Sequence, residues 1–188
     1  APPAPRSVKI EVSPRCNYRC LAGDTLIDTI YGRIPIKELS ERFDAVPVYT
    51  YKDGEVFLSE AVNIRRYGVG EALMRVLFDD GTHIDCTPDH RFLQFRSRGA
   101  SAGTDEWPTA AVNLQPGDRV RAYRENLAGK GYTVICWGRE FRRHRSRMVM
   151  DYLLGRKLAP TEQVHHRDRD ITNDHPDNLE YVASAKEH

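Results

Sequence analysis

Three side chains in the first part of the chain are of the types that cleavage of a peptide bond by its own chain requires. A cysteine that attacks the carbonyl carbon of the residue before it forms a thioester, if other groups polarise the amide and protonate the departing nitrogen. Cys20 can supply the thiol, which makes Arg19–Cys20 the scissile bond. Thr87 and His90 offer a hydroxyl and an imidazole, and an imidazole with a near-neutral pKa can donate to that nitrogen. These residues predict an N-to-S acyl shift.

A second group of side chains that could do chemistry lies near the C-terminal end. Its members are His165, His166, Asn173, Asn178 and His188. Hydrolysis of a phosphodiester needs a base that activates water and a metal ion that stabilises charge, and imidazoles can serve either need. Because side chains alternate along a strand, the adjacent histidines should point to opposite sides and differ in role.

Positive charge is concentrated just before this second group. Five arginines occur with a single acid, Glu140, although the net charge of the whole chain is only +1. They are Arg139, Arg142, Arg143, Arg145 and Arg147. This local excess suits a polyanionic partner, and the alternative is an ordinary solvated helix face.

The elements that must position the first group are mostly strands. Asp-Gly turns predict two hairpins, and Pro35–Leu39 predicts a short helical turn. The hairpins comprise Val48–Tyr51 with Val56–Leu58, and Leu73–Phe78 with Thr82–Asp85. A last strand is expected near Arg119–Tyr123, and Glu125–Gly131 has the polarity and the glycines of a linker.

The second group requires a hairpin and helices. We expect a strand at Tyr132–Trp137 and a helix over about Arg142–Leu154, with Gly155 as its C-cap. The inner side of this helix would carry Val149, Tyr152 and Leu153, and its arginines would face outward. Strands at Val164–His166 and Leu179–Val182 would flank a polar loop over Asp168–Asp177. Ser184 and Glu187 form a capping box, which predicts a final helix with His188 in its first turn.

Residues 20–124 resemble the intein or Hint (hedgehog–intein) family. Its first block, Cys-Leu-x-x-Asp-Thr, matches Cys20–Thr25, and its Thr-x-x-His block matches Thr87–His90. Trp107 and the turn Asn113–Asp118 also look like the family. The resemblance implies a mainly β domain in which Cys20 is the nucleophile and Thr87 and His90 activate the bond before it. The alternative is that Cys20 and His90 are ordinary core residues.

Residues 1–19 look like a stub of a host protein. The spacing Cys16-x-x-x-Cys20 is similar to the start of the radical-SAM cluster motif, whose third cysteine would fall at Gly23. An intein inserted before the second cluster cysteine would explain that difference, and a chance spacing is the alternative. Complete inteins end with a penultimate His and a terminal Asn, which this sequence lacks. We therefore expect either a separate C-terminal fragment, as in a split intein, or a truncated sequence.

Residues from about 131 to 188 resemble HNH homing endonucleases, whose ββα-metal site is a hairpin followed by a helix. The resemblance implies that His166 is the general base, that Asn178 orients its imidazole, and that His165 and His188 bind one divalent ion. Magnesium or manganese is the expected ion, although nitrogen ligands also suit zinc and nickel. Asn173 is expected to brace the loop. The arginines listed above would then contact phosphates of double-stranded DNA, with an affinity that depends on salt.

Composition excludes several classes of protein. The four cysteines form no Cys-x-x-Cys pair and no disulfide framework, so we expect a reduced, cytoplasmic chain. No apolar run is long enough for a membrane span, and Ala1–Lys9 lacks the apolar core of a signal peptide. Because the sequence does not begin with methionine, we expect a processed product or a fragment.

Three hypotheses follow from these observations. The first is a mainly β Hint domain over residues 20–124, followed by a linker and a small α+β HNH endonuclease over residues 125–188. The second is a free-standing HNH endonuclease whose Hint-like part is a non-catalytic scaffold. The third is a degenerate relic that folds without activity. Scission at Arg19–Cys20 that depends on Cys20 would separate the first hypothesis from the other two.

Overall fold

The computed structural model describes residues 7–8, 21–52, 55–65, 72–97, 104–129, 131–137 and 141–183, and these are mainly β. The described helices are α1 (Ile36–Arg42) and α2 (Arg145–Leu154), with 3-10 turns at Ala111–Asn113 and Pro176–Asn178. The earlier strands are β1 (Ser7–Val8), β2 (Leu26–Thr29), β3 (Gly32–Pro35), β4 (Ala45–Lys52), β5 (Glu55–Val62), β6 (Met74–Leu77), β7 (His83–Cys86), β8 (Arg91–Ser97) and β9 (Thr104–Ala110). The later strands are β10 (Ala122–Ala128), β11 (Tyr132–Trp137), β12 (Phe141–His144), β13 (Gln163–His166) and β14 (Leu179–Val182). None of the helices in these ranges is long and apolar enough to cross a membrane.

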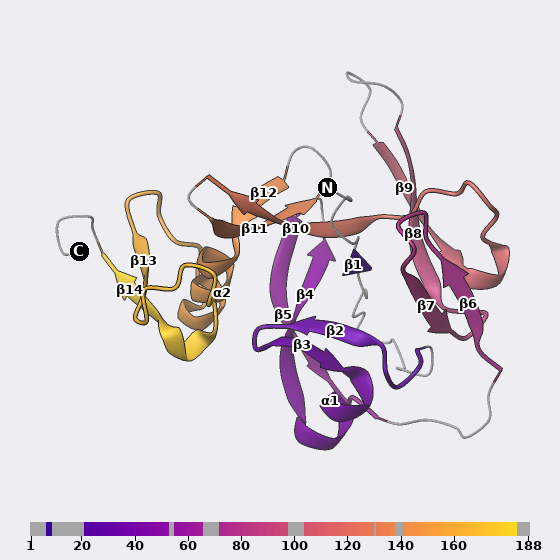
Figure 1. Ribbon diagram of the computed structural model, residues 1–188, viewed down its shortest axis with the longest axis horizontal. Coiled ribbons are helices and arrows are strands. Elements are labelled where there is room, and N and C mark those ends of the chain that lie inside the picture. The colour runs from indigo at the N-terminus through magenta and orange to yellow at the C-terminus, as the bar shows by residue number, and fades with distance from the viewer. Residues whose placement is uncertain are drawn as a thin grey trace.

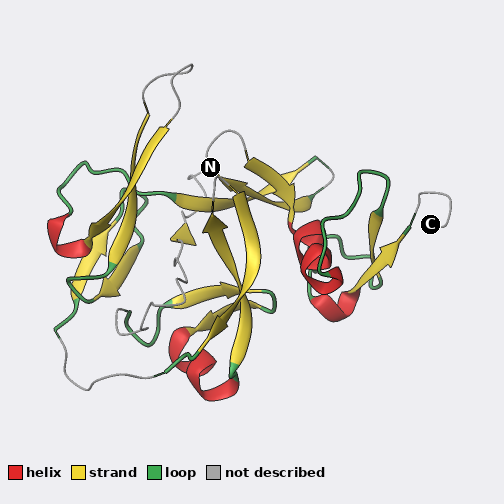
Figure 2. Cartoon of the chain, turned by 180° about the vertical axis from the view of Figure 1, so that it is seen from behind, coloured by secondary structure: helices red, strands yellow, loops and turns green. Residues whose placement is uncertain are grey.

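The strands form small antiparallel sheets that follow one another along the long axis of the molecule (Figure 1). The hairpins β6–β7 and β8–β9 lie at one end, and α2 with the hairpin β13–β14 lies at the other. Between them are the sheets β3-β2-β4-β5 and β1-β10-β11-β12. The view from behind has the same arrangement, with strand β10 running from the β6–β9 end into the middle (Figure 2).

Several elements of the first part were predicted correctly. The hairpins β4–β5 and β6–β7 occur where the Asp-Gly turns predicted them, and Gly81 adopts the positive φ of +83° that favours glycine. The turn Asp53-Gly54 itself lies outside the described residues. Helix α1 begins directly after Pro35, as predicted. The local signals were sufficient here because each one constrains the backbone within a few residues.

The predicted linker over Glu125–Gly131 is wrong for most of its length. Strand β10 continues to Ala128 and pairs with β11 over five residue pairs, from Arg124↔Cys136 to Ala128↔Tyr132. The sequence of this stretch looked like a linker because it is polar and contains glycines. In the structure one face of the strand is open to solvent, and even the apolar side chain of Leu127 is exposed. The pairing with β11 nevertheless satisfies its backbone groups.

The predicted start of the second helix is also wrong. Residues 141–144 form strand β12, which pairs with β11 at Ile135↔Arg143 and Cys136↔Arg142, and α2 begins only at Arg145. The end of the helix is confirmed, because Gly155 takes a left-handed conformation with φ +66°. Val149 is fully buried as expected, but Leu153 is 49% exposed and does not belong to the inner face. The predicted hairpin of β13 and β14 is confirmed.

The largest core cluster, called the shared core below, contains residues from both the first part of the chain (residues 20–124) and the second part (residues 125–188). It joins Ile30, Tyr49, Val56 and Leu58 of the first part to residues from β11, α2, β14 and the loop after α2. The members from the second part are Ile135, Trp137, Met148, Val149, Met150, Leu158 and Leu179. Two further clusters lie within the first part, one under α1 and one among β6–β9.

Polar contacts follow the same junction. The Tyr152 hydroxyl donates to Glu60 at 3.0 Å, and Lys157 forms an ion pair with Glu55 at 2.6 Å. The Tyr51 ring stacks on Trp137 with ring centroids 4.0 Å apart. The apolar cluster and these contacts together hold α2 and β11 against strands β4 and β5.

Candidate functional site

The described residue next to Cys20 is paired with the strand that leads to Thr87. Leu21 forms an antiparallel bridge with Cys86, and the Ala22 amide donates to the Asp85 carbonyl at 2.8 Å. Cys20 itself lies outside the described residues. The chain therefore brings the residue after the predicted nucleophile beside the residue before Thr87.

Thr87 and His90 lie together in a tight turn after β7. The His90 amide donates to the Thr87 carbonyl at 3.0 Å, and both side chains are buried. The His90 ring meets Phe92 edge to face, with centroids 5.0 Å apart. Burial lowers the pKa of His90, although the nearby Asp89 carboxylate opposes this effect. The imidazole is therefore neutral at neutral pH, with one nitrogen able to donate and one able to accept.

The sequence reasoning did not assign a role to Asp89. The Thr87 hydroxyl donates to the Asp89 carboxylate at 2.5 Å, and this hydrogen bond lowers the pKa of Asp89. The hydroxyl proton is thus already used within the turn, so the Thr87 oxygen can accept a further hydrogen bond but cannot donate one. The spacing Thr-x-Asp is a common side-chain turn and could have indicated this contact.

The two adjacent histidines lie on the hairpin of β13 and β14, where His165 pairs with Glu180 and His166 pairs with Leu179. His166 is buried and His165 is half-buried, as the predicted alternation requires. Predicted ligand His188 lies outside the described residues.

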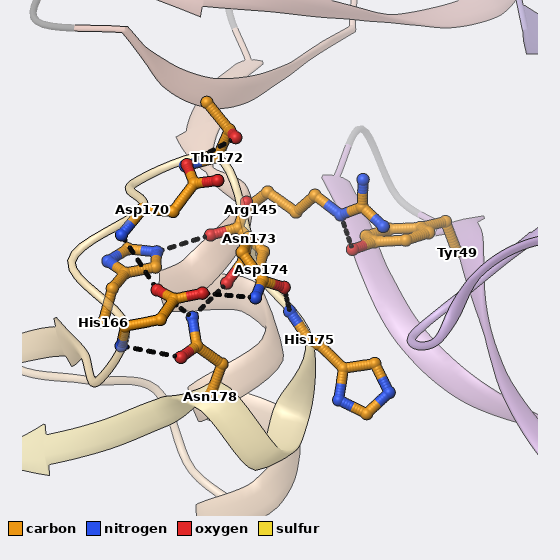
Figure 3. A network of polar contacts seen from close by, with 10 residues as sticks. Tyr49, Arg145, His166, Asp170, Thr172, Asn173, Asp174, His175 and Asn178 are labelled. Carbon is orange, nitrogen blue, oxygen red and sulfur yellow. Dashed lines mark hydrogen bonds and ion pairs between the residues drawn. The ribbon is translucent and has the colours of Figure 1, made fainter.

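His166 is held by a carboxylate and not by the predicted amide. Its Nε2 lies 2.9 Å from Oδ1 of Asp174, and the two side chains are 4% and 2% exposed (Figure 3). Burial raises the pKa of Asp174, whereas the contact with His166 and the charge of Arg145 oppose that rise. Sequence reasoning missed Asp174, because a single aspartate inside a polar loop carries no periodic signal.

Asn178 instead organises the loop that precedes it. Its Nδ2 donates to Asp168 at 2.9 Å and to the Asn173 carbonyl at 2.8 Å, and its Oδ1 accepts from the Asp168 amide. These bonds turn the amide toward Asp168 and none of them reaches His166, so the orientation of His166 by Asn178 stays a prediction. Asn173 braces the same loop by donating to Asp168 at 2.6 Å, as expected.

The described residues supply only part of a metal site. Nowhere in the described ranges do three His, Cys, Asp or Glu side chains gather so that they could hold a metal ion. His165 is the one predicted ligand among them. The other predicted ligand, His188, lies outside the described ranges, so binding of a divalent ion stays a prediction.

Three of the predicted DNA-binding arginines make contacts within the chain. Arg143 pairs with Asp151 at 2.5 Å, and Arg145 donates to the Tyr49 hydroxyl at 3.1 Å. Arg147 donates to the main-chain oxygens of Glu162 and Ala159 at 2.6 and 2.8 Å. Arg142 is exposed, and Arg139 lies outside the described residues. Binding of DNA by these side chains stays a prediction.

Comparison with known proteins finds a distant relative. No protein-family model matches the chain. The chain is similar to a protein named as the B subunit of DNA gyrase, from Synechocystis, at 28% identity over 178 residues. The match covers 89% of this chain but 16% of that relative, so the chain spans about a sixth of the relative's length. Neither residues 20–124 nor residues 125–188 alone make up 89% of the chain, so the match must extend across both parts.

Proposed function

We propose that the chain is an intein-type segment that forms a thioester at Arg19–Cys20 and carries an HNH-type DNA endonuclease in its second part. In this proposal residues 20–124 have a Hint fold and the region around β13 and β14 has a ββα-metal fold. The observation that carries the first activity is the pairing of Leu21 with Cys86. It joins the chain directly after Cys20 to the turn that holds Thr87 and His90.

The acyl shift balances without any added reactant. The Cys20 sulfur bonds to the Arg19 carbonyl carbon, the bond from that carbon to the Cys20 nitrogen breaks, and the thiol proton ends on the freed amine. His90 suits the proton transfer because its neutral ring can donate to the departing nitrogen and accept a proton in return. Because the Thr87 hydroxyl donates its hydrogen bond to Asp89, its oxygen remains free to accept one from the amide of the scissile Arg19–Cys20 bond.

The second activity rests on the buried pair of His166 and Asp174. Because Asp174 holds Nε2, the other ring nitrogen, Nδ1, would take the proton from an attacking water. Asp174 would fix the tautomer and the direction of the ring, as a carboxylate does for a catalytic histidine. DNA is the proposed substrate, and exposed Arg142 is available to bind its phosphates.

The similarity to the Synechocystis protein supports an inserted segment. It extends across both parts of this chain, yet it covers a small share of a relative whose name describes neither splicing nor DNA cleavage. A self-excising segment inside a host protein would give this pattern. The host of this chain would be radical-SAM-like, as the spacing of Cys16 and Cys20 suggests.

The shared core favours a second candidate function. Because β4 and β5 pack directly against α2 and β11, the first part could serve as a scaffold for a free-standing endonuclease. In that case the thioester chemistry would be absent and DNA cleavage would remain.

Two assays on the purified chain test the proposals separately. Intact mass with and without dithiothreitol should reveal loss of residues 1–19 in the presence of thiol, and Cys20→Ala should abolish it. An unchanged mass of the wild-type chain would contradict the thioester proposal. Incubation of supercoiled plasmid DNA with manganese or magnesium should give nicked DNA, and His166→Ala should not. Equal nicking by both proteins would contradict the endonuclease proposal.

A further inference from the structure

The loop between α2 and β13 leads directly to the two adjacent histidines. It comprises residues 155–162, and β13 begins with Gln163 and carries His165 and His166. Helix α2 lies beside the hairpin of β13 and β14 (Figure 1). Because Glu162 is followed at once by the strand, contacts that fix the end of the loop also fix where β13 starts.

Arg147 of α2 binds the main chain of this loop at three points. Its Nη1 donates to the Glu162 carbonyl at 2.6 Å, and its Nη2 donates to the carbonyls of Ala159 and Leu158 at 2.8 and 3.3 Å. The Leu158 side chain is buried in the shared core, so the beginning of the bound segment is anchored as well. A planar guanidinium with several fixed donors suits such a set of oxygens. Arg147 therefore ties the segment before β13 to α2.

The Glu162 side chain ties the same segment to β14. Its carboxylate is 12% exposed and accepts four hydrogen bonds, which uses the capacity of its two oxygens. Arg156 donates two of them, at 2.7 and 2.8 Å, and the Ala159 amide donates one at 2.6 Å. The fourth comes at 2.7 Å from the hydroxyl of Tyr181, which pairs with Val164 of β13. The end of the loop is thus fixed to the hairpin as well as to the helix.

Asp151 of α2 completes the attachment of the loop. Its Oδ1 accepts from the Leu158 amide at 2.8 Å, and its Oδ2 forms an ion pair with Arg143 of β12 at 2.5 Å. We call Arg147, Asp151 and Glu162 the loop clamp. Two arginines whose predicted partner was DNA therefore act on the loop, Arg147 directly and Arg143 through Asp151.

Arg142 and Arg147 differ in their surroundings. Arg142 is exposed, whereas Arg147 is half-buried and uses both of its terminal nitrogens within the chain. To reach a phosphate, Arg147 would have to give up its hydrogen bonds to main-chain oxygens, and these oxygens would lose a charged donor. The contacts favour a partner within the chain for Arg147, and Arg142 is the better candidate for a phosphate.

We propose that Arg147 and Glu162 are positioning residues for His165 and His166, and that Arg147 acts on the hairpin of β13 and β14 and not on DNA. This inference rests on the proposed endonuclease function for its effect on DNA cleavage. Its structural content, that the loop clamp holds β13 in place, can be measured without any cleavage.

Two matched arginine variants separate positioning from DNA binding. Arg147→Met should lower kcat for plasmid nicking about tenfold, the scale of changes in groups that orient a site from outside, and should leave the plasmid concentration at half-maximal rate unchanged. Arg142→Met should raise that concentration and reduce the slope of log K for DNA binding against log salt by about 1. A wild-type kcat in Arg147→Met, or a raised plasmid concentration at half-maximal rate in that variant, would overturn the inference.

Two variants within the loop provide a second comparison. Glu162→Gln places an amide group against the Ala159 amide and Arg156, which are themselves donors, so hydrogen bonds of the clamp are lost. Lys157→Met removes an exposed charge whose partner, Glu55, lies outside the clamp. We expect a lower kcat in Glu162→Gln and the wild-type kcat in Lys157→Met, each measured well below the melting temperature of the variant. Equal kcat in these two variants would contradict the positioning role of Glu162.

Hydrogen exchange separates failure of this inference from failure of the endonuclease proposal. In Arg147→Met and Glu162→Gln, peptides that cover residues 158–166 should exchange faster than in the wild-type chain, whereas peptides from β4 and β5 should not. If the wild-type chain cuts no DNA, the endonuclease proposal fails and these peptides still decide whether the clamp holds β13. Unchanged exchange would refute the inference even if the chain cuts DNA. Faster exchange with a wild-type kcat would assign the clamp to stability alone and would also overturn the positioning role.

Discussion

Because the two parts of the chain share one core, we expect truncation of a buried side chain in the second part to destabilise the first part as well. Ile135 of β11 is fully buried in the cluster that also contains Tyr49, Val56 and Leu58. Truncating Ile135 to alanine removes three carbon atoms, at about 0.8 kcal/mol of lost transfer free energy each, and leaves a cavity. The free energy of unfolding should therefore fall by about 2–5 kcal/mol. A loss of about 3 kcal/mol corresponds to roughly a hundredfold faster amide exchange wherever exchange requires the shared core to open.

Hydrogen exchange measured by mass spectrometry locates the effect. In Ile135→Ala, peptides from β4 and β5 should exchange faster, together with peptides from α2 and β14. The matched control is Ile84→Ala, which truncates the same residue type in the separate cluster of β6–β9. That variant should accelerate exchange in β6–β9 and leave β13–β14 unchanged. If Ile135→Ala accelerates exchange only after residue 130, the two parts are independent folding units and the reasoning fails.

Three smaller predictions concern single side chains. The hydrogen bonds from Arg156 hold the pKa of Glu162 at about 2, below its usual 4.5. The stabilisation from this pair is therefore complete above pH 4.5 and is lost as the pH falls toward 2. An acid titration followed by circular dichroism should show this loss of stability in the wild-type chain and not in Glu162→Gln. Burial lowers the pKa of His90 below its usual 6.5. Protonation of His90 therefore favours the unfolded chain, and the free energy of unfolding should fall as the pH drops below 6.5. In NMR spectra of the folded chain the His90 ring signals should titrate below pH 6.5. Gly155→Ala places a side chain at φ +66° and should lower the free energy of unfolding in urea by about 1 kcal/mol, and an equal stability would contradict the assigned C-cap.

Local signals predicted the elements that depend on few residues. The Asp80-Gly81 turn fixes the register of β6 and β7, and Gly155 ends α2, because each needs a backbone conformation that glycine adopts at little cost. The hairpin of β13 and β14 was also predictable, since two short stretches with β-branched and aromatic residues flank an evidently polar loop. Mainly β structure and the order of these elements therefore follow from the sequence.

The junction between the parts could not be predicted in the same way. Strand β10 is polar enough to look like a linker, and β12 contains Arg142 and Arg143, which looked like the start of a helix. Both stretches are strands because β11, a buried and apolar strand, pairs with them on its two sides. Pairing between neighbouring strands depends on the fold around them and overrides the preference of the individual residues.

The two sites differ in how much of their geometry the sequence could reveal. Thr87 and His90 meet within one turn, so their spacing was sufficient to place them together. His166 meets Asp174 across a loop, and Tyr49, which lies far earlier in the chain, accepts a hydrogen bond from Arg145 at the start of α2. No spacing rule links such residues, because they are brought together by packing of the shared core.

This difference in packing has a consequence for the two proposed activities. Thr87 follows Cys86, which belongs with Phe92 and Ala111 to the cluster of β6–β9, whereas His166 is enclosed by elements of the shared core at the other end of the molecule (Figure 1). The two catalytic groups therefore depend on different apolar clusters, although Tyr49 and Arg145 bind the two parts of the chain together. Substitutions in the cluster of β6–β9 should impair thioester formation and spare DNA nicking. Substitutions in the shared core should impair nicking first, because that core includes Leu179, the strand partner of His166, whereas Thr87 follows a residue of the other cluster.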